Sequence, residues 1–349
     1  MRIERAARAA ACVAALVCAG DNPGAAQSSA PVRVGLLASL SEAPFLLAHA
    51  RGYFRAEGLE IEIVRFQNTA DMVAPLATGQ LEVGAGAPTV AFFSGILRGI
   101  PLKLVADKGR NSPGHGFNAL LVRKDLVDGG RVRTLADIKG LKIGSPSRHS
   151  PVEVELDFGL RKVGLGLDDV SIEMLPLPNM IPALANKAID GAMTLEPQIA
   201  LAQARGIAVR LMGADEMFPD YQIAGILFGA EFQRTREDAA RRWMVAYLRG
   251  IRDFLDGLAA GGETREALFH VLAESMDIKD RALYARMVMP GFNADGYLHL
   301  DSMKETVAWF VARGALRQGP KLADFVDYRY LDHALERLGR RGQAQSVPR

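Results

Sequence analysis

The sequence predicts an α/β protein of two doubly wound lobes with a hinged cleft between them and extra helices at the C-terminal end. Three observations lead to this prediction. Short apolar strands alternate with helical segments from residue 32 to about residue 212, which is typical of parallel sheets covered by helices. The same order of elements occurs twice in that stretch. Two further apolar segments, 117–123 and 223–228, stand where the chain would pass between the lobes.

The first repeat begins at residue 32 and ends near residue 106. Gly58 and Gly79 stand where its first two helices should end, because glycine readily adopts the left-handed conformation that ends many helices. Pro88 opens the third helix, since proline is tolerated in a first helical turn. The expected strands are 32–37, 61–66, 81–85 and 102–106, and the expected helices are 44–56, 71–78 and one that starts at Pro88.

The second repeat follows the same plan at a nearly constant distance along the chain. Gly35 and Gly144, Ile61 and Ile172, and Leu81 and Ile189 are 109, 111 and 108 residues apart. Two similar lobes in tandem are the simplest explanation of this spacing. The expected strands are 141–144, 171–175, 189–193 and 207–211, and the expected helices are 151–163, 181–186 and 197–204.

The two crossing segments divide the chain into lobes. We expect 31–117 to begin lobe 1, 118–222 to form lobe 2, and 223–340 to return to lobe 1. Two crossings define a hinge that can open and close a cleft. The residues from 341 to 349 are expected to be a disordered tail, because basic residues there stand among Gly and Gln. The helices expected in the return segment are 236–258, 264–275, 279–287, 302–313 and 327–338.

The first 26 residues are typical of a signal peptide. A basic start that includes Arg2 and Arg5 precedes a short apolar run, and Gly24 and Ala26 have the spacing of a cleavage site. One alternative is a disordered, Ala-rich leader with no targeting role. The other is lipidation at Cys18, although Val17 before it is a poor match to such sites. Both cysteines, Cys12 and Cys18, lie in this leader. A periplasmic mature chain would therefore have no thiol for disulfides, thiolate–metal sites or cysteine catalysis.

Composition and motifs exclude several classes of function. The chain has 42 basic and 40 acidic residues, so nothing in its charge favours nucleic acid or an anionic membrane. No segment after the leader has the roughly 20 apolar residues of a spanning helix. The six histidines form no metal-spaced cluster, and neither a nucleophile elbow nor a phosphate loop is present. We therefore expect a monomeric binding protein without metal or cofactor and not an enzyme.

The candidate site lies where the strands of both lobes end. Ligands of open parallel sheets bind at the carboxyl ends of the strands, beside helix N-termini. Six loops would meet there, and their hydroxyl and amide groups suit a compact polar or anionic ligand. The loops are 39–41, 67–69, 86–89, 145–149, 178–179 and 194–196. The candidate ligand-binding residues in them are Ser39, Ser41, Asn68, Pro88, Thr89, Ser147, Arg148 and Glu196.

Each candidate also has a structural interpretation. Four of them could be helix caps or turn residues instead, namely Ser39, Ser41, Asn68 and Thr89. Arg148 is the expected anchor for a carboxylate or sulfonate, because a guanidinium binds such groups through two hydrogen bonds; the alternative is a solvated surface arginine. Glu196 could contact a ligand or only place negative charge at a helix N-terminus.

Four segments resemble the substrate-binding proteins of nitrate/sulfonate/taurine ABC importers, a group that includes relatives similar to thiamine-pyrimidine synthases. These segments are 52–63 (GYFRAEGLEIEI), 77–86 (ATGQLEVGAG), 135–145 (LADIKGLKIGS) and 188–197 (AIDGAMTLEP). The resemblance implies a type II periplasmic binding protein that closes on a small molecule and delivers it to an ABC permease in the inner membrane. It also places the ligand loops on Ser39, Ser41, Pro88, Thr89, Ser147, Arg148 and Glu196.

The chain departs from the family pattern at one site position. The tryptophan that often precedes the Glu-Pro pair in the family is Leu195 here, which removes a flat stacking surface. The synthase relatives carry a cysteine-rich motif that the mature chain lacks. Two alternatives stay open beside the importer component: a periplasmic enzyme related to the pyrimidine synthases, and a module that reports ligand occupancy to a membrane receptor.

Overall fold

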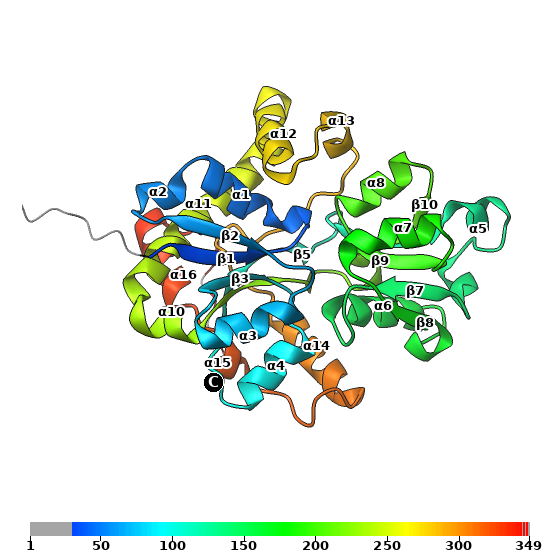
Figure 1. Ribbon diagram of the computed structural model, residues 1–349, viewed down its shortest axis with the longest axis horizontal. Coiled ribbons are helices and arrows are strands. Elements are labelled where there is room, and N and C mark those ends of the chain that lie inside the picture. Colours follow the sequence, from blue (N-terminus) through cyan, green and yellow to red (C-terminus); the bar gives the residue numbers. More distant parts are fainter. Residues whose placement is uncertain (1–29, 344, 346, 348–349) are drawn as a thin grey trace, which may run out of the picture. The chain divides into compact units, whose positions relative to one another are not determined.

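Two five-stranded sheets form the framework of this computed structural model, which describes residues 30–343, 345 and 347 (Figure 1). Four strands of the first sheet belong to the blue and cyan part of the chain, and the second sheet lies in the green part. Residues 31–349 make up one compact unit. The predicted signal peptide, with both cysteines, lies outside the described residues.

The two sheets have the same topology, as the repeat predicted. In the first, the order is β2-β1-β3-β12-β4, and in the second it is β8-β7-β9-β6-β10. In each sheet the first three strands are parallel, and the fourth runs antiparallel to both of its neighbours. The first sheet consists of β1 (Val32–Leu36), β2 (Ile61–Arg65), β3 (Val83–Gly86), β4 (Lys103–Asp107) and β12 (Gly225–Phe228). The second consists of β6 (Asn118–Arg123), β7 (Lys142–Ser145), β8 (Ser171–Met174), β9 (Gly191–Leu195) and β10 (Ala208–Gly213).

Equivalent glycines show how closely the two lobes match. A Cβ atom at Gly35 in β1 would lie 2.9 Å from the Leu81 side chain, and one at Gly144 in β7 would lie 2.9 Å from that of Ile189. Leu81 and Ile189 are the positions that the sequence repeat pairs. In both lobes, a glycine in one strand therefore packs closely against the residue that lies two positions before the next parallel strand on its other side begins.

The antiparallel strand of each sheet brings the chain in from the other lobe. The segments 117–123 and 223–228, which we expected to cross between lobes, instead contain β6 and β12, which are paired inside the sheets. A short antiparallel pair precedes them, made of β5 (Arg110–Asn111) and β11 (Tyr221–Gln222). The hinge segments are thus shorter than predicted, because both apolar strands are used to complete a sheet.

Helices cover both sheets, with boundaries close to those predicted. The main difference is in the first helix, which Gly52, at a φ of 73°, divides into α1 and α2. In the first lobe the helices are α1 (Ala43–Ala50), α2 (Tyr53–Ala56), α3 (Ala70–Thr78) and α4 (Val90–Leu97). In the second they are α5 (Lys124–Asp128), α6 (Pro151–Arg161), α7 (Met180–Ala185), α8 (Gln198–Ala204) and α9 (Ala214–Met217).

The return segment is helical and packs mainly on the first lobe, as predicted. The long helix α11 contacts α1, α2 and α16. Its Trp243 ring lies against Phe45, Phe54 and Phe228, so one aromatic cluster joins helix and sheet. The helices are α10 (Ala230–Thr235), α11 (Glu237–Ala260), α12 (Gly262–Met276), α13 (Arg281–Tyr284), α14 (Leu300–Ala312), α15 (Leu322–Phe325) and α16 (Arg329–Leu338).

The start of the predicted tail is bound to the fold. Arg341 forms an ion pair with Asp256, and its backbone N–H donates to Asp295. The N–H of Gly342 donates to the same Asp295 carboxylate. The prediction of a disordered tail is therefore corrected at residues 341 and 342, because a buried acceptor lies beside the end of α16.

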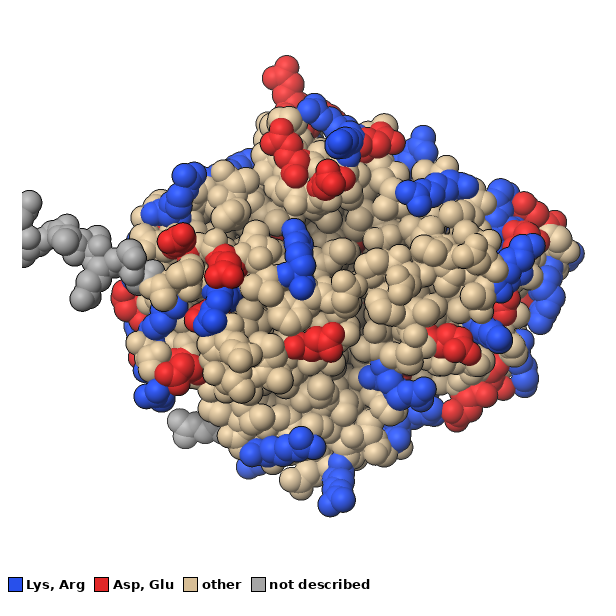
Figure 2. Space-filling view, in the orientation of Figure 1, with Lys and Arg blue, Asp and Glu red and all other residues tan. Residues whose placement is uncertain are grey.

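Charge and hydropathy patterns agree with the composition. On the face in Figure 2, acidic and basic side chains are interspersed, and neither sign forms a broad continuous area. Within the described part of the chain, no helix combines the length and apolar character needed to cross a bilayer.

Candidate functional site

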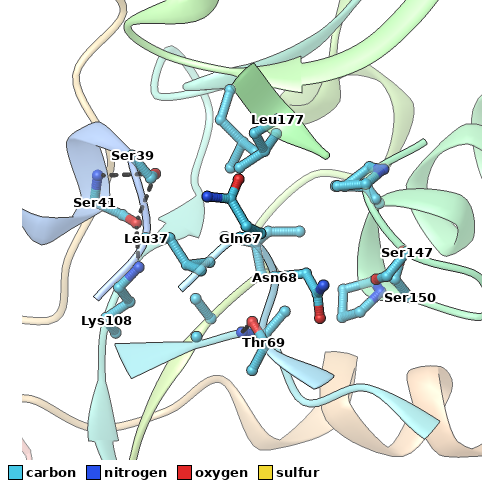
Figure 3. Close-up of a pocket in the computed structure, with 18 of the residues that line it drawn as sticks. Leu37, Ser39, Ser41, Gln67, Asn68, Thr69, Lys108, Ser147, Ser150 and Leu177 are labelled. Carbon is cyan, nitrogen blue, oxygen red and sulfur yellow. Dashed lines mark hydrogen bonds between the residues drawn. The ribbon is translucent and has the colours of Figure 1, made fainter. Parts of the chain in front are cut away.

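A cavity lies between the lobes at the carboxyl ends of the strands. Its empty space is about 540 Å³ when the part open to solvent is included, and about 50 Å³ can hold the centres of water-sized molecules. Five of the six predicted loops contribute lining residues, and the sixth does so through its neighbour Leu177. Figure 3 shows side chains from both lobes directed into this space.

A chain of hydrogen bonds forms one wall. Ser39 and Ser41 follow β1, and their hydroxyl oxygens are 3.0 Å apart. Ser39 Oγ also accepts from the Ser41 N–H at 3.3 Å, so Ser39 caps the short turn that begins there. Lys108, directly after β4, donates from Nζ to Ser41 Oγ at 2.8 Å. It also forms an ion pair of 2.9 Å with Glu42.

The loop after β2 forms the next part of the wall. Asn68 faces the cavity, but its side chain also exchanges two hydrogen bonds with Asp71 in the first turn of α3. Thr69 Oγ1 accepts from the Ala87 N–H at 3.0 Å. A Cβ at Gly86 would lie 2.4 Å from that hydroxyl oxygen. Glycine is therefore needed at residue 86 for the loops after β2 and β3 to meet.

The second lobe contributes a less polar wall. Ser147 lines the cavity, and so do Ser150 and Val152 at the start of α6. Ser150 is 2% exposed, and its Oγ has no hydrogen-bond partner among the described residues. Leu177 and Leu195 supply apolar surface. The position of the family's tryptophan thus does face the cavity, and an aliphatic side chain occupies it here.

Several lining residues lie outside the six predicted loops, and four of them are Lys108, Phe117, Ile223 and Ala224. All four lie on or beside segments that pass between the lobes. Lys108 carried a usable signal, since a charged residue directly follows the buried strand β4. From the sequence, Phe117 could line a pocket or belong to the core. It is fully buried and also forms part of the cavity wall.

Arg148 lies outside the cavity lining. Its side chain is exposed, and it has no hydrogen bond or ion pair with any described residue. Its charge helps to lower the pKa of neighbouring His149, after the larger effect of burial. His149 does not line the cavity either; it has a φ of 48°, and its N–H donates to Glu153.

Glu196 is buried between segments of both lobes and does not line the cavity. Its carboxylate accepts from the N–H groups of Ala200 in α8 and Val288 in the return segment. Its carbonyl oxygen accepts from the Leu40 N–H at 2.8 Å. Burial raises the pKa of Glu196 to about 7. In this structure, Glu196 joins the two lobes to each other.

Pro88 and Thr89, the remaining candidates, are buried behind the lining. Thr89 precedes α4, but its hydroxyl makes no capping hydrogen bond. Its Oγ1 has no partner among the described residues. The structure thus brings Ser39, Ser41, Asn68 and Ser147 together at the cavity. Pro88, Thr89, Arg148 and Glu196 lie outside its lining.

A second polar group lies near the hinge. Glu155 in α6 is fully buried and accepts hydrogen bonds from the side-chain amides of Asn111 in β5 and Asn118 in β6. Burial raises the pKa of Glu155 to about 8, although the two amides oppose the shift. This carboxyl group links α6 to both ends of the segment that enters the second lobe.

Direct bonds hold the lobes together around the cavity. Trp309 Nε1 in α14 donates to Asp157 Oδ2 in α6 at 2.7 Å. Arg313 at the end of α14 forms an ion pair of 2.8 Å with Asp168 in the second lobe. Together with the bond from Leu40 to Glu196, they describe a closed arrangement. Among the described residues, no group of three or more His, Cys, Asp or Glu side chains could hold a metal ion.

This two-lobed α/β architecture, with a cavity between the lobes, is the fold of the periplasmic binding proteins. The NMT1/THI5-like family model matches residues 40–257. The chain belongs to this family.

Curated relatives of the chain include both binding proteins and enzymes. A putative binding protein of Brucella abortus is 27% identical over 230 residues, which cover 64% of this chain and 66% of that protein. The 4-amino-5-hydroxymethyl-2-methylpyrimidine phosphate synthase of Schizosaccharomyces pombe is 29% identical over 157 residues, or 44% of this chain and 41% of that enzyme.

Solved structures support the same fold. The ligand-binding component of an ABC-type import system from Staphylococcus aureus superposes with a TM-score of 0.71 at 17% identity, covering 87% of this chain and 98% of that one. The periplasmic nitrate-binding protein NrtA of Synechocystis PCC 6803 gives a TM-score of 0.74 at 13% identity, covering 88% and 89%.

Proposed function

We propose that the chain is the solute-binding component of an ABC importer. It captures a small molecule in the cavity between its lobes and delivers it to a permease in the inner membrane. The observation that carries the proposal is the cavity itself, which both lobes line through loops at their strand ends. The unpartnered Ser150 hydroxyl provides a buried polar group for a ligand to bind.

A ligand screen by thermal shift tests this function. The panel contains nitrate, sulfonates, aromatic and aliphatic carboxylates, and pyrimidines. A ligand at 100 times its Kd stabilises the folded state by about 2.7 kcal/mol. At least one compound should therefore raise the Tm.

Cavity binding is checked with a matched pair of variants. Ala87 lines the cavity and Ala204 is exposed on α8. Ala87→Phe should abolish the shift, and Ala204→Phe should keep it. Absence of any stabilising compound, or equal binding by Ala87→Phe, contradicts the proposal.

We also propose export to the periplasm, based on the basic start and the spacing of Gly24 and Ala26. Mass spectrometry of protein recovered from the periplasm should show a new N-terminus near Gln27. Recovery of soluble cytoplasmic protein that retains Met1 would contradict this prediction.

The second candidate function is catalysis related to pyrimidine synthesis, which the Schizosaccharomyces pombe relative favours. Such enzymes are expected to carry a cysteine-rich motif. This sequence has only two cysteines, at positions 12 and 18, and cannot form that motif. We therefore propose binding without turnover. A stabilising pyrimidine that the purified protein returns chemically unchanged agrees with binding, and its conversion to a product supports the enzyme.

A further inference from the structure

We infer that the solute is uncharged overall and offers a hydrogen-bond acceptor to Ser39 and Lys108, and that the buried Lys108–Glu42 pair sets this preference. The inference rests on the proposed function and names the class of ligand for the same cavity. The sequence led us to expect an anionic ligand held by Arg148. In the structure, Arg148 lies outside the cavity lining and Lys108 lies in it, so we now infer an uncharged ligand.

The balance of charge at the cavity is the first argument. Among the described lining residues, Lys108 is the only one with an ionisable side chain. Its ammonium lies 2.9 Å from Glu42 Oε1, and the two side chains are 3% and 1% exposed. As an ion pair, the two side chains have a net charge of zero. An anion entering the cavity would lose its hydration without gaining an unpaired cation, which is costly.

The direction of the hydrogen bonds is the second argument. Ser41 Oγ accepts from Lys108, so its own proton is available for Ser39 Oγ, 3.0 Å away. Ser39 Oγ also accepts from the Ser41 N–H, which leaves the Ser39 proton to donate into the cavity. An ammonium has three N–H donors, and Lys108 uses two of them, on Ser41 and Glu42. Both groups therefore offer donors, and they suit a carbonyl oxygen or a ring nitrogen.

The other ionisable groups near the cavity do not change this balance. Glu153, Glu155 and Glu196 are buried, but none of them lines the cavity. Arg65, whose charge also acts on Glu42, and Arg148 are exposed and outside the lining. The remaining surface is supplied largely by apolar side chains such as Leu37, which suits the body of an uncharged molecule.

Pairs of compounds that differ mainly in charge test the inference. The probes are nicotinamide and nicotinate, benzamide and benzoate, and benzenesulfonamide and benzenesulfonate, measured by thermal shift and titration calorimetry on the full exported protein. In the wild type, the uncharged member of at least one pair should bind at least about 10-fold more tightly than its anion.

Variants of the pair show whether it sets the preference. Glu42→Gln leaves Lys108 without its counter-charge and should shift the affinity ratio toward the anion by about 10-fold or more. The double variant Glu42→Gln/Lys108→Met removes both charges and should show no such shift. The double variant also controls for the loss of folding that an unpaired buried charge can cause, which circular dichroism detects.

Three outcomes separate the hypotheses. Tighter binding of the anions by the wild type, lost in Arg148→Ala, would overturn the inference, restore the anionic anchor and leave the proposed function standing. Preference for the uncharged members without a shift in Glu42→Gln would overturn the role of the pair. If none of the uncharged probes binds, the inferred ligand class is wrong. If no compound of the wider panel binds either, the proposed function is also contradicted.

Discussion

At the scale of single residues, the buried ionisable side chains decide the charge of the candidate site. Lys108 and Glu42 are 66 positions apart in the sequence and meet only because β1 and β4 belong to one sheet. Arg148, in contrast, stands in a loop where sequence position suggested an anchor, and its side chain is exposed. Residue type and loop position could predict which loops form the site. They could not predict which charged side chains are turned inward, because this depends on partners from distant strands.

Glu155 makes the stability of the protein depend on pH. Burial raises its pKa from 4.5 to about 8 in the folded state. Its contribution to stability is therefore fully present below about pH 4.5 and is lost as the pH rises toward 8. In this window the free energy of unfolding should fall with a slope of up to about 1.4 kcal/mol per pH unit for this group.

Glu155→Gln keeps the size of the side chain but removes the titration. Urea unfolding at a series of pH values should show a flatter profile between pH 5 and 8 for the variant. Glu173→Gln, on the exposed edge strand β8, serves as the control and should follow the wild type. An unchanged profile in Glu155→Gln would show that this carboxyl group is not the one that titrates.

At the scale of elements, the strands and their order followed from the repeat, and the boundaries that failed have local causes. Apolar spacing continues from α1 into α2, so the sequence predicted one helix where Gly52 changes the direction of the chain. The strands β6 and β12 were identified correctly but assigned to the crossings. Their pairing with distant strands decides their role, and periodicity along the chain contains no information about pairing.

Gly250 tests the packing of α11 on α1. A Cβ atom there would lie 2.1 Å from the Pro44 carbonyl oxygen and 2.9 Å from Ala48 Cβ. Backbone cannot move as a side-chain end can, so Gly250→Ala should lower the free energy of unfolding by about 2 kcal/mol or more.

Gly257→Ala on the same helix is the matched control. Its Cβ would lie 3.3 Å from the end of the Leu268 side chain, so improved helix propensity should offset the small adjustment. Chemical denaturation measures both variants. Equal stability of the two would mean that α11 and α1 are not packed as closely as described.

At the scale of the whole molecule, the contacts between lobes explain how a bound solute could be held. The bond from Trp309 to Asp157 joins α14 and α6 on one side of the cavity, and the bond from Leu40 to Glu196 joins loops from the two lobes. Because α6 also begins at the cavity with Pro151 and Val152, we expect closure to bring the bond to Trp309 and the ligand contacts into place together.

Trp309→Phe removes the donor to Asp157 and keeps most of the ring volume. A hydrogen bond to a charged group contributes about 1.5–3 kcal/mol, so the solute found in the screen should bind roughly 10-fold or more weakly. Trp243→Phe is the control, since Trp243 lies in the core of the first lobe and its Nε1 has no partner among the described residues. It should change stability more than affinity. Equal affinity losses in the two variants, measured by calorimetry, would contradict a specific role of α14 in closure.

Solution X-ray scattering with and without a stabilising solute tests the central claim most directly, namely that the lobes close around a ligand in the cavity. We propose that the short hinge pair β5 and β11 lets the lobes separate without solute, and that a bound solute together with the bonds between lobes stabilises the closed form. The radius of gyration should therefore decrease on binding, and Ala87→Phe should show no decrease. Superimposable scattering profiles for the wild type, with a solute that calorimetry shows to be bound, would contradict the hinged-cavity account.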